Sequence, residues 1–354
     1  MRTIKLAGLK LCRGMGLFAL ARRLTRHRLR ILCYHGFSVG DQHEYSPILF
    51  MRGETFRRRM DTLRRLGLRV VSMEEATQLL AENSVAHGEV AITIDDGWKT
   101  THSIAAPILA GHRFPACVYV TTYYCERQTE VFNVVVWYML WKTSLTTVTL
   151  NGIHPDVDGT YDLGADRRGT GSRWIAAVER NVPADRRRAV LVQMAEALGL
   201  DTAGLLAGER FKLMSPQEVA ALNAEFGLSV ELHTHRHRLP TDSAEEVLSE
   251  IGENRRLLER WTGARSSHFC YPSGIYATQH PGWLEKAGVS TATTCDAGLN
   301  DGRTPRMLLK RYLDRENWSD VEFEAAISGF TELTAPFRAA LRRTRASDST
   351  GTIG

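Results

Sequence analysis

Two adjacent aspartates stand directly after a run of apolar, β-branched residues. The run is Glu89–Ile94, the pair is Asp95 and Asp96, and Gly97 follows. Neighbouring side chains on an extended chain point in different directions, so one carboxylate can bind a metal ion while the other faces a reacting water molecule. Aspartate also favours the N-cap position of helices. The pair by itself therefore leaves both catalysis and helix capping open.

A cluster of histidines follows a second apolar run. His233, His235 and His237 come directly after Leu228–Leu232. Neutral imidazoles are common ligands of zinc and related transition metals, and two of them four residues apart can bind one ion. The alternative is an exposed histidine-rich loop. Because the whole chain has only 12 histidines, three within five residues favour a metal site.

Two further candidate segments lie at the ends of predicted strands. His268–Tyr271 runs into the turn Pro272–Gly274, which alone is generic turn chemistry. Near the start of the chain, a strand predicted over Arg30–Tyr34 is followed by His35. A histidine there could transfer a proton, or it could be a buried structural residue.

Alternating strands and helices would position these segments. Apolar periodicity predicts helices over Glu54–Leu66, Met73–Leu80, Thr100–Ala110, Ser215–Phe226, Ser243–Trp261, His280–Ala287 and Asp320–Ile327. Strands are predicted over Arg30–Tyr34, Val70–Val71, Glu89–Ile94, Ala116–Thr121, Leu228–Leu232, His268–Tyr271, Val289–Thr293 and Met307–Leu313. This order predicts parallel βα units, whose strands end at one face, where active sites form.

Residues 125–213 interrupt the alternation. Turn residues between Thr146–Leu150 and Thr160–Leu163 predict a β-hairpin. Helices are expected to follow near Ser172–Asn181 and Ala184–Leu198. We therefore expect an insertion within one barrel-like domain.

Charge and composition indicate three parts to the chain. With 354 residues, 43% of them hydrophobic and 24% charged, a large domain over residues 30–330 is expected. Residues 1–29 form a basic segment, because the first 30 residues carry nine lysines and arginines and no acid. Residues 331–354 are expected to form a C-terminal helix and a polar tail.

The basic segment has two interpretations. Its leucines and cations could place residues 1–30 on an anionic membrane surface, or a terminal helix could pack on the domain itself. Its apolar run ends in Arg22 and Arg23, so no cleaved signal peptide is expected. Nucleic-acid binding is not expected either, because the cations cluster at one end without a recognisable binding module.

Membrane-spanning segments and disulfides are not expected. Val131–Trp141 is very apolar, but a bilayer-spanning helix needs roughly 20 residues, so a buried or interfacial helix is predicted. The six cysteines show no CxxC pairing, which favours buried free thiols in a reducing compartment. The expected location is the cytoplasm, with peripheral contact at the inner membrane face left open.

Taken together, these segments resemble the polysaccharide deacetylase superfamily (NodB homology, carbohydrate esterase family four). TIDDG at 93–97 is similar to its first motif, usually TFDDG, and HTHRH at 233–237 is similar to its second, H-[ST]-x-x-H. YPSG at 271–274 resembles the third motif, often R-x-P-x-G or Y-P-x-G. The order of motifs agrees over residues 30–315. The resemblance implies an α/β fold, the distorted (β/α)7 barrel of this family with a mid-chain insertion.

The resemblance also implies roles for individual residues. Asp95 resembles the general base, and Asp96, His233 and His237 resemble the ligands of one divalent metal ion. Zinc is expected, and Co²⁺, Ni²⁺ or Mn²⁺ would be tolerated. His235 falls at a variable position and is not assigned to the metal.

The third motif and the acid depart from the usual pattern. Tyr271, Pro272 and Gly274 resemble a groove wall near the substrate acetyl group, and a backbone N–H near Tyr271 is a candidate oxyanion donor. However, Tyr271 stands where the family often has arginine. The late leucine–histidine motif that usually supplies the acid is missing, since no histidine follows His280. His35 resembles the early histidine that serves as acid in exopolysaccharide (poly-N-acetylglucosamine) deacetylases.

The implied function is metal-dependent removal of N-acetyl groups from amino sugars of a poly- or oligosaccharide or glycan precursor, with release of acetate. An acetylated glycan is the expected partner, and the insertion's Trp137, Tyr138 and Trp141 favour it because aromatic faces stack on sugar rings. One alternative is another amidase on the same fold, such as an enzyme acting on small ureide rings. Others are a glycan-binding protein with a decayed site, and a membrane-surface scaffold recruited by residues 1–30.

Overall fold

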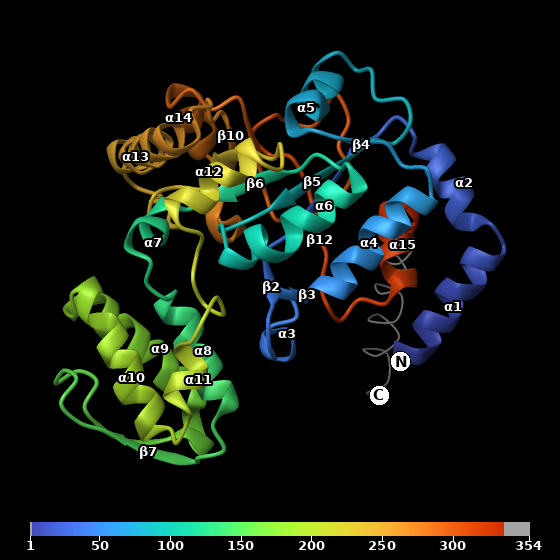
Figure 1. Cartoon of the computed structure of the whole chain (residues 1–354). Helices are drawn as coiled ribbons and strands as arrows, with labels where there is room; N and C mark the ends of the chain where they lie inside the picture. Colours follow the sequence, from blue (N-terminus) through green and yellow to red (C-terminus); the bar gives the residue numbers. More distant parts are fainter. Residues whose placement is uncertain (1, 336–354) are drawn as a thin grey trace, which may run out of the picture.

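A curled sheet of parallel strands organises the protein (Figure 1). The structure is a computed structural model that describes residues 2–335. Seven strands follow one another in the order β11-β10-β9-β6-β5-β1-β12, and β4 also pairs with β5. All of these pairings are parallel. The strands are β1 (Arg30–Tyr34), β4 (Val70–Val71), β5 (Val90–Ile94), β6 (Cys117–Val120), β9 (Ser229–Leu232), β10 (His268–Cys270), β11 (Thr291–Thr293) and β12 (Tyr312–Leu313).

Helices connect these strands and cover the sheet. Because the sheet is covered, all five residues of β5 are buried, which matches its continuous apolar sequence. A short parallel pair, β2 (Gly36–Ser38) with β3 (Phe50–Arg52), follows β1. The helices are α3 (Gln42–Tyr45), α4 (Gly53–Arg65), α5 (Met73–Ala81), α6 (Ala106–His112), α7 (Thr122–Arg127), α12 (Pro216–Ala224), α13 (Ala244–Thr262), α14 (His280–Lys286) and α15 (Asp320–Ile327).

The predicted strands and helices occur in the predicted order, together with short elements that were not predicted, and the clearest difference lies at the last strand. Met307–Leu313 was expected to be a single strand, but only Tyr312–Leu313 pairs along β1. The preceding Leu309 instead pairs with β11, because its N–H donates to Ala292 and its carbonyl accepts from Thr294. The segment therefore crosses from β11 to β1 and draws the two edges of the sheet together.

The interrupting residues fold into a lobe that projects at the lower left of Figure 1. The predicted β-hairpin and the helix predicted over Val131–Trp141 are confirmed. At the base of the lobe the buried carboxylate of Glu130 pairs with Arg188 and lies 4.0 Å from the Lys212 ammonium. The lobe contains α8 (Phe132–Lys142), β7 (Thr147–Leu150), β8 (Gly159–Asp162), α9 (Leu163–Asn181), α10 (Arg187–Ala197) and α11 (Thr202–Leu206).

The basic segment forms two helices, α1 (Arg2–Gly14) and α2 (Leu17–Leu24), that pack on α15. Phe18 is buried against Val321 and Ala325, and partly buried apolar residues of α1 join this cluster. Packing on the domain is therefore observed for one face of this segment, while membrane contact stays a prediction. The polar tail predicted near the end of the chain lies outside the described residues beyond 335.

The described residues contain no helix with the length and apolarity needed to cross a bilayer. All six cysteines are free. Four of them, Cys33, Cys117, Cys125 and Cys270, are buried, as the sequence predicted for structural thiols.

Candidate active site

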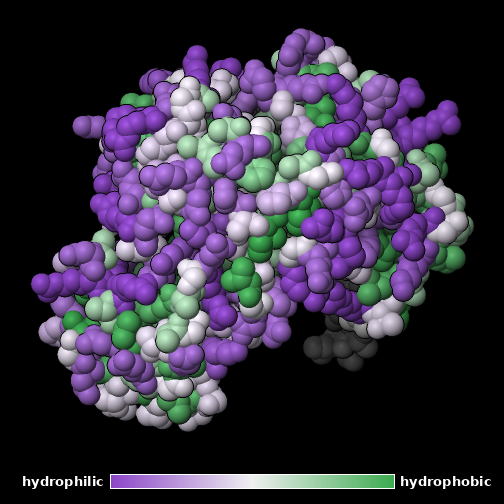
Figure 2. Space-filling model, in the orientation of Figure 1, coloured by the Kyte–Doolittle hydropathy of each residue, from purple (hydrophilic) through white to green (hydrophobic). Residues whose placement is uncertain are grey.

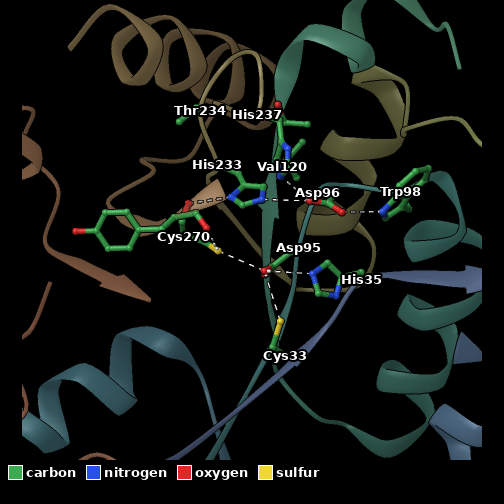
Figure 3. Close-up of polar contacts among 12 residues, drawn as sticks. Cys33, His35, Asp95, Asp96, Trp98, Val120, His233, Thr234, His237 and Cys270 are labelled. Atoms are coloured by element: carbon green, nitrogen blue, oxygen red, sulfur yellow. Dashed lines mark hydrogen bonds and ion pairs between the residues drawn. The ribbon is translucent and has the colours of Figure 1, made fainter. Parts of the chain in front are cut away.

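The residues predicted to carry chemistry meet at one end of the sheet (Figure 3). Asp95 and Asp96 directly follow β5, while His233 directly follows β9. Strands β5 and β9 both pair with β6, so the parallel sheet brings distant sequence segments to one edge. The chain turns sharply here, with φ values of 73° at Asp96 and 85° at Gly97. A Cβ at Gly97 would lie 3.0 Å from Val120, so glycine suits both the conformation and the space.

Asp96, His233 and His237 form a set of three possible metal ligands. Oδ1 of Asp96 lies 3.2 Å from Nε2 of His233 and 3.2 Å from Nε2 of His237. The ligand atoms of all three residues lie within 4.8 Å of one another. Two imidazoles and one carboxylate leave coordination positions for water and substrate, as in catalytic zinc sites. The set therefore fits one divalent ion.

Neighbouring groups orient these ligands. Nδ1 of His233 lies 2.9 Å from the Cys270 carbonyl and donates to it, which leaves Nε2 as the atom available to a metal. The indole N–H of Trp98 donates to Oδ2 of Asp96 at 2.9 Å, so Oδ1 stays on the side of the histidines. Burial favours the neutral acid, yet the imidazoles of His233 and His237 hold the pKa of Asp96 well below its usual range. Asp96 is therefore ionised.

Asp95 has a different environment from its neighbour. Arg311 donates two hydrogen bonds to it, from Nη1 to Oδ1 at 2.7 Å and from Nη2 to Oδ2 at 2.8 Å. The thiols of Cys33 and Cys270 lie 3.5 and 3.3 Å from Oδ2. Burial alone would raise the pKa of Asp95, but the Arg311 guanidinium outweighs burial and the pKa is lowered to about 2. Asp95 is thus a buried, ionised carboxylate outside the metal set.

Sequence reasoning missed Arg311. The residue lies just before β12, within the apolar stretch predicted as Met307–Leu313, and no motif of the family resemblance covers it. A signal was nevertheless present, because an arginine inside an apolar strand must be buried with a partner of opposite charge. Tyr271 occupies the position where the family often has arginine. In this chain the guanidinium that reaches Asp95 is that of Arg311, which lies next to a different strand.

His35 follows β1 and faces Asp95 in Figure 3. Its Nε2 lies 3.9 Å from Oδ2 of Asp95, and its side chain is 15% exposed. Its buried Nδ1 has no hydrogen-bond partner within residues 2–335. The structure therefore brings the predicted acid to the predicted base, although the role of His35 remains a prediction.

Comparison with protein-family models identifies one family. Residues 189–292 match the model described as polysaccharide deacetylase. Over this segment the chain resembles the polysaccharide deacetylase family. The matched segment contains His233, His237 and the Tyr271–Gly274 turn, whereas Asp95 and Asp96 precede it. A search of curated proteins found no match.

Several solved structures share the fold of this chain. The deacetylase PplD of Streptococcus pyogenes, in complex with acetate, is 15% identical, with a TM-score of 0.56 over 85% of this chain and 98% of its own. IcaB from Ammonifex degensii is 18% identical, with a TM-score of 0.55 and coverage of 85% and 97%. A de-N-acetylase from Aggregatibacter actinomycetemcomitans is 12% identical, with a TM-score of 0.52 and coverage of 84% and 98%. The predicted distorted (β/α)7 barrel is thereby confirmed.

The third motif of the family resemblance differs from its expected role. The Tyr271 side chain is fully buried, and its ring packs against Phe269 and Tyr276 at centroid distances of 5.4 and 5.1 Å. Its backbone N–H donates to the Thr293 carbonyl at 3.1 Å, within the pairing of β10 and β11. The N–H of Tyr271 itself is therefore used by the sheet, and an oxyanion donor elsewhere near Tyr271 stays a prediction. The Tyr271 side chain belongs to the core rather than to a groove wall.

Pro272 and Gly274 shape the turn after β10. Pro272 is buried, and Gly274 has a φ of 68°. A Cβ at Gly274 would lie 2.6 Å from the Cβ of Cys295, so the turn can pass there only with glycine. Direct contact of these two residues with a substrate stays a prediction.

His235 and Asn254 hold the second motif of the family resemblance in place. Nδ1 of His235 lies 2.9 Å from the Thr122 hydroxyl, so this histidine is outside the metal set, as expected. Asn254, which sequence reasoning missed, accepts the His233 backbone N–H at 2.9 Å and donates to the Val120 carbonyl at 2.9 Å. It is fully buried on α13. An asparagine on the apolar face of an amphipathic helix was the available signal.

A cavity of about 410 Å³ lies beside the metal set. This volume falls in the usual range of small-ligand pockets. The barrel supplies Asp96, His237, Trp98 and Tyr124 to its lining, and the lobe supplies Val134 and Glu179 among others. The lobe thus forms part of the wall of the candidate active site.

Proposed function

We propose that the protein is a metal-dependent hydrolase that removes N-acetyl groups from amino sugars of a poly- or oligosaccharide, or of a glycan precursor. Its products are acetate and a free amine. One observation supports this most strongly: Asp96, His233 and His237 converge beside a second, buried carboxylate, that of Asp95. This arrangement separates a metal-binding carboxylate from a proton-accepting one.

The proposed ion would be held by Oδ1 of Asp96 and by Nε2 of both His233 and His237. Nitrogen and oxygen ligands of this kind suit Zn²⁺ and tolerate Co²⁺, Ni²⁺ or Mn²⁺. Such an ion, when bound, polarises the acetyl carbonyl and lowers the pKa of a water ligand from 15.7 to roughly 7. Trp98 and the Cys270 carbonyl keep the protein ligands oriented toward one point.

Asp95 is the proposed general base. As the water oxygen bonds to the acetyl carbon, an O–H bond of the water breaks and Asp95 accepts the proton. With a pKa of about 2, Asp95 is ionised at neutral pH but is a weak base. A base this weak can accept a proton from the water only if the pKa of the water is itself lowered. The proposal therefore requires the metal.

His35 is the proposed general acid. When the bond between the acetyl carbon and the nitrogen breaks, protonated His35 gives its proton to that nitrogen and the amine leaves. Its Nε2 lies 3.9 Å from Asp95, which supports the proposal that base and acid act on one reacting centre. Asp95 then releases its proton to solvent and His35 takes one up from solvent, which restores the site.

The proposed substrate class rests on the family and on one structural neighbour. PplD was solved in complex with acetate, which would be a product of the proposed reaction. The predicted aromatic platform gives no support, because Tyr138 is buried and neither Trp137 nor Trp141 lines the cavity. Tyr124 lines it instead.

Acetate release from a substrate panel tests the proposal. The panel contains N-acetylglucosamine oligomers, poly-N-acetylglucosamine and a cyclic ureide, each incubated with the whole protein. We expect acetate from an acetylated sugar and no ring opening of the ureide. Asp96→Asn should abolish acetate release, whereas Asp185→Asn, at an exposed position of the lobe, should leave it intact. Ureide hydrolysis without deacetylation would reject the proposed substrate, and inactivity on every compound with bound zinc would favour a decayed site.

A further inference from the structure

The outer face of α1 and α2 exposes a row of large apolar side chains. Of the twelve exposed large hydrophobic residues within residues 2–335, five lie in the first 24 residues. Ile4 and Leu11, seven residues apart, share one side of α1, and Met15 lies in the turn that follows it, while Leu20 and Leu24 share a side of α2. These five side chains are 51–78% exposed: Ile4, Leu11, Met15, Leu20 and Leu24.

The opposite face of these helices is fixed to the barrel. Leu6, Leu9 and Cys12 pack against the cluster that contains Phe18 and α15. Ion pairs strengthen this contact, since Lys5 lies 2.8 Å from Glu322 and Arg13 lies 3.6 Å from Glu324. The outer apolar row is therefore held in a defined orientation rather than presented by a loose arm.

Cations accompany the outer row, and α1 and α2 themselves carry no acid. Lys10, Arg23 and Arg26 are exposed beside the apolar side chains, and the first acidic residue of the chain is Asp41. Figure 2 shows apolar residues interspersed with hydrophilic ones along its right-hand edge, where Figure 1 places α1 and α2. A convex surface that combines apolar and cationic side chains matches the interface of a membrane with anionic headgroups.

We propose that α1 and α2 dock the protein on an anionic lipid bilayer through this outer row. The five apolar side chains would enter the boundary between headgroups and acyl chains, while Lys10, Arg23 and Arg26 would contact lipid phosphates. A second copy of the chain fits this face less well, because a symmetric pair would bring its cations against their own copies without any acid between them.

Vesicle co-sedimentation of the full-length protein tests the docking. We expect the protein to sediment with vesicles of phosphatidylcholine and phosphatidylglycerol, and not with phosphatidylcholine alone. High salt should weaken binding, because it screens the contribution of the cations. Equal binding to both vesicle types, or binding to neither, would overturn the proposal.

Paired variants separate the apolar and the cationic contributions. Lys10→Gln with Arg23→Gln should weaken partitioning about 25-fold, since each cation near an anionic surface contributes about fivefold. Leu11→Gln with Met15→Gln should weaken it by about tenfold or more. Matched controls are Lys286→Gln and Leu248→Gln, exposed residues of α14 and α13, and both should bind like the unaltered protein.

Folding and oligomeric state complete the test. All four variant positions are exposed, so circular dichroism and Tm should not change, and acetate release from a soluble oligosaccharide should stay the same. Loss of vesicle binding in folded variants therefore supports the docking, whether or not the protein proves to be a deacetylase. If both control variants lose binding equally, or if the outer row instead forms a dimer that does not bind vesicles, the proposal is wrong.

Discussion

Asp95 lies opposite a guanidinium, and its carboxylate is the group on which the proposed proton transfer depends. Asp95→Asn preserves the shape of the side chain but cannot accept a proton at neutral pH. Acetate release should therefore fall by about 10²–10⁴-fold, the usual contribution of a general base. Metal content, measured by elemental analysis, should not change, because Asp95 is outside the ligand set. Turnover within a few-fold of the unaltered protein would remove Asp95 from this role.

Arg311 acts on the reaction only through Asp95, which makes it a positioning residue. In Arg311→Met, burial acts on Asp95 without the compensating guanidinium, so the pKa of Asp95 should rise from about 2. Since the base must be ionised, the acid limb of the pH–rate profile should move to higher pH. Arg311→Lys should show only part of this shift, because lysine keeps the positive charge beside Asp95. An unshifted acid limb in a folded Arg311→Met would show that the pair is only structural.

His35 should affect turnover without affecting the metal. His35→Ala removes the proposed proton donor, so acetate release should fall by about 10²-fold or more, and the decline of rate at alkaline pH should change. The matched variant His87→Ala, at an exposed position, should behave like the unaltered protein. If His35→Ala loses bound metal, His35 belongs to the metal site rather than to proton transfer.

At the scale of elements, β9 carries a buried carboxylate in its middle. Glu231 accepts the backbone N–H groups of Ser267 and His268 at 2.7 and 2.8 Å and so ties β9 to the start of β10. Burial nevertheless raises the pKa of Glu231 to about 7. The protonated form of Glu231 therefore favours the folded state, and this stabilisation is lost as pH rises from 4.5 toward 7.

Glu231→Gln should reveal this dependence. Glutamine does not titrate. The free energy of unfolding of the variant, relative to that of the unaltered protein, should therefore increase from acid to alkaline pH. The expected gain is about 3 kcal/mol, from a rise of the pKa from 4.5 to about 7 at about 1.4 kcal/mol per pH unit. Urea unfolding at both ends of this range measures it, with the exposed Glu225→Gln as control. A difference in free energy of unfolding between the two proteins that does not vary with pH would contradict the raised pKa of Glu231.

The elements themselves could largely be predicted from the sequence. Strands such as Val90–Ile94 are continuous β-branched runs, and α12 begins at a capping box of Ser215 and Glu218. The segment Met307–Leu313 could not be placed, because its apolar pattern does not reveal that it bonds first to β11 and then to β1. Pairing between distant segments is a tertiary property that local periodicity does not encode.

The candidate site could be predicted only in part, for a similar reason. Asp95, Asp96, His233 and His237 stand at strand ends, and the parallel order of strands was enough to bring them together. The contact between Asp95 and Arg311 joins positions 216 residues apart, so no spacing rule identifies it. Tyr271 was misplaced because an aromatic side chain at a strand end can equally face the core.

For the whole molecule, barrel and lobe act together at the site. The metal set lies at the end of the barrel strands, and the lobe provides one wall of the adjacent cavity. The insertion was predicted from the interrupted alternation, but its contact with the site was not, since nothing in the sequence of a hairpin and its helices indicates what they face.

The central claim, that a metal ion at Asp96, His233 and His237 drives deacetylation, is tested most directly by the rate of acetate release. The rate is measured on one preparation before chelation, after chelation and after restoration of Zn²⁺, with metal content determined at each stage. We expect the rate to fall to background after chelation and to return with about one ion per chain, whereas Asp96→Ala with His233→Ala should not recover. A metal-free protein that still releases acetate at its original rate would contradict the account.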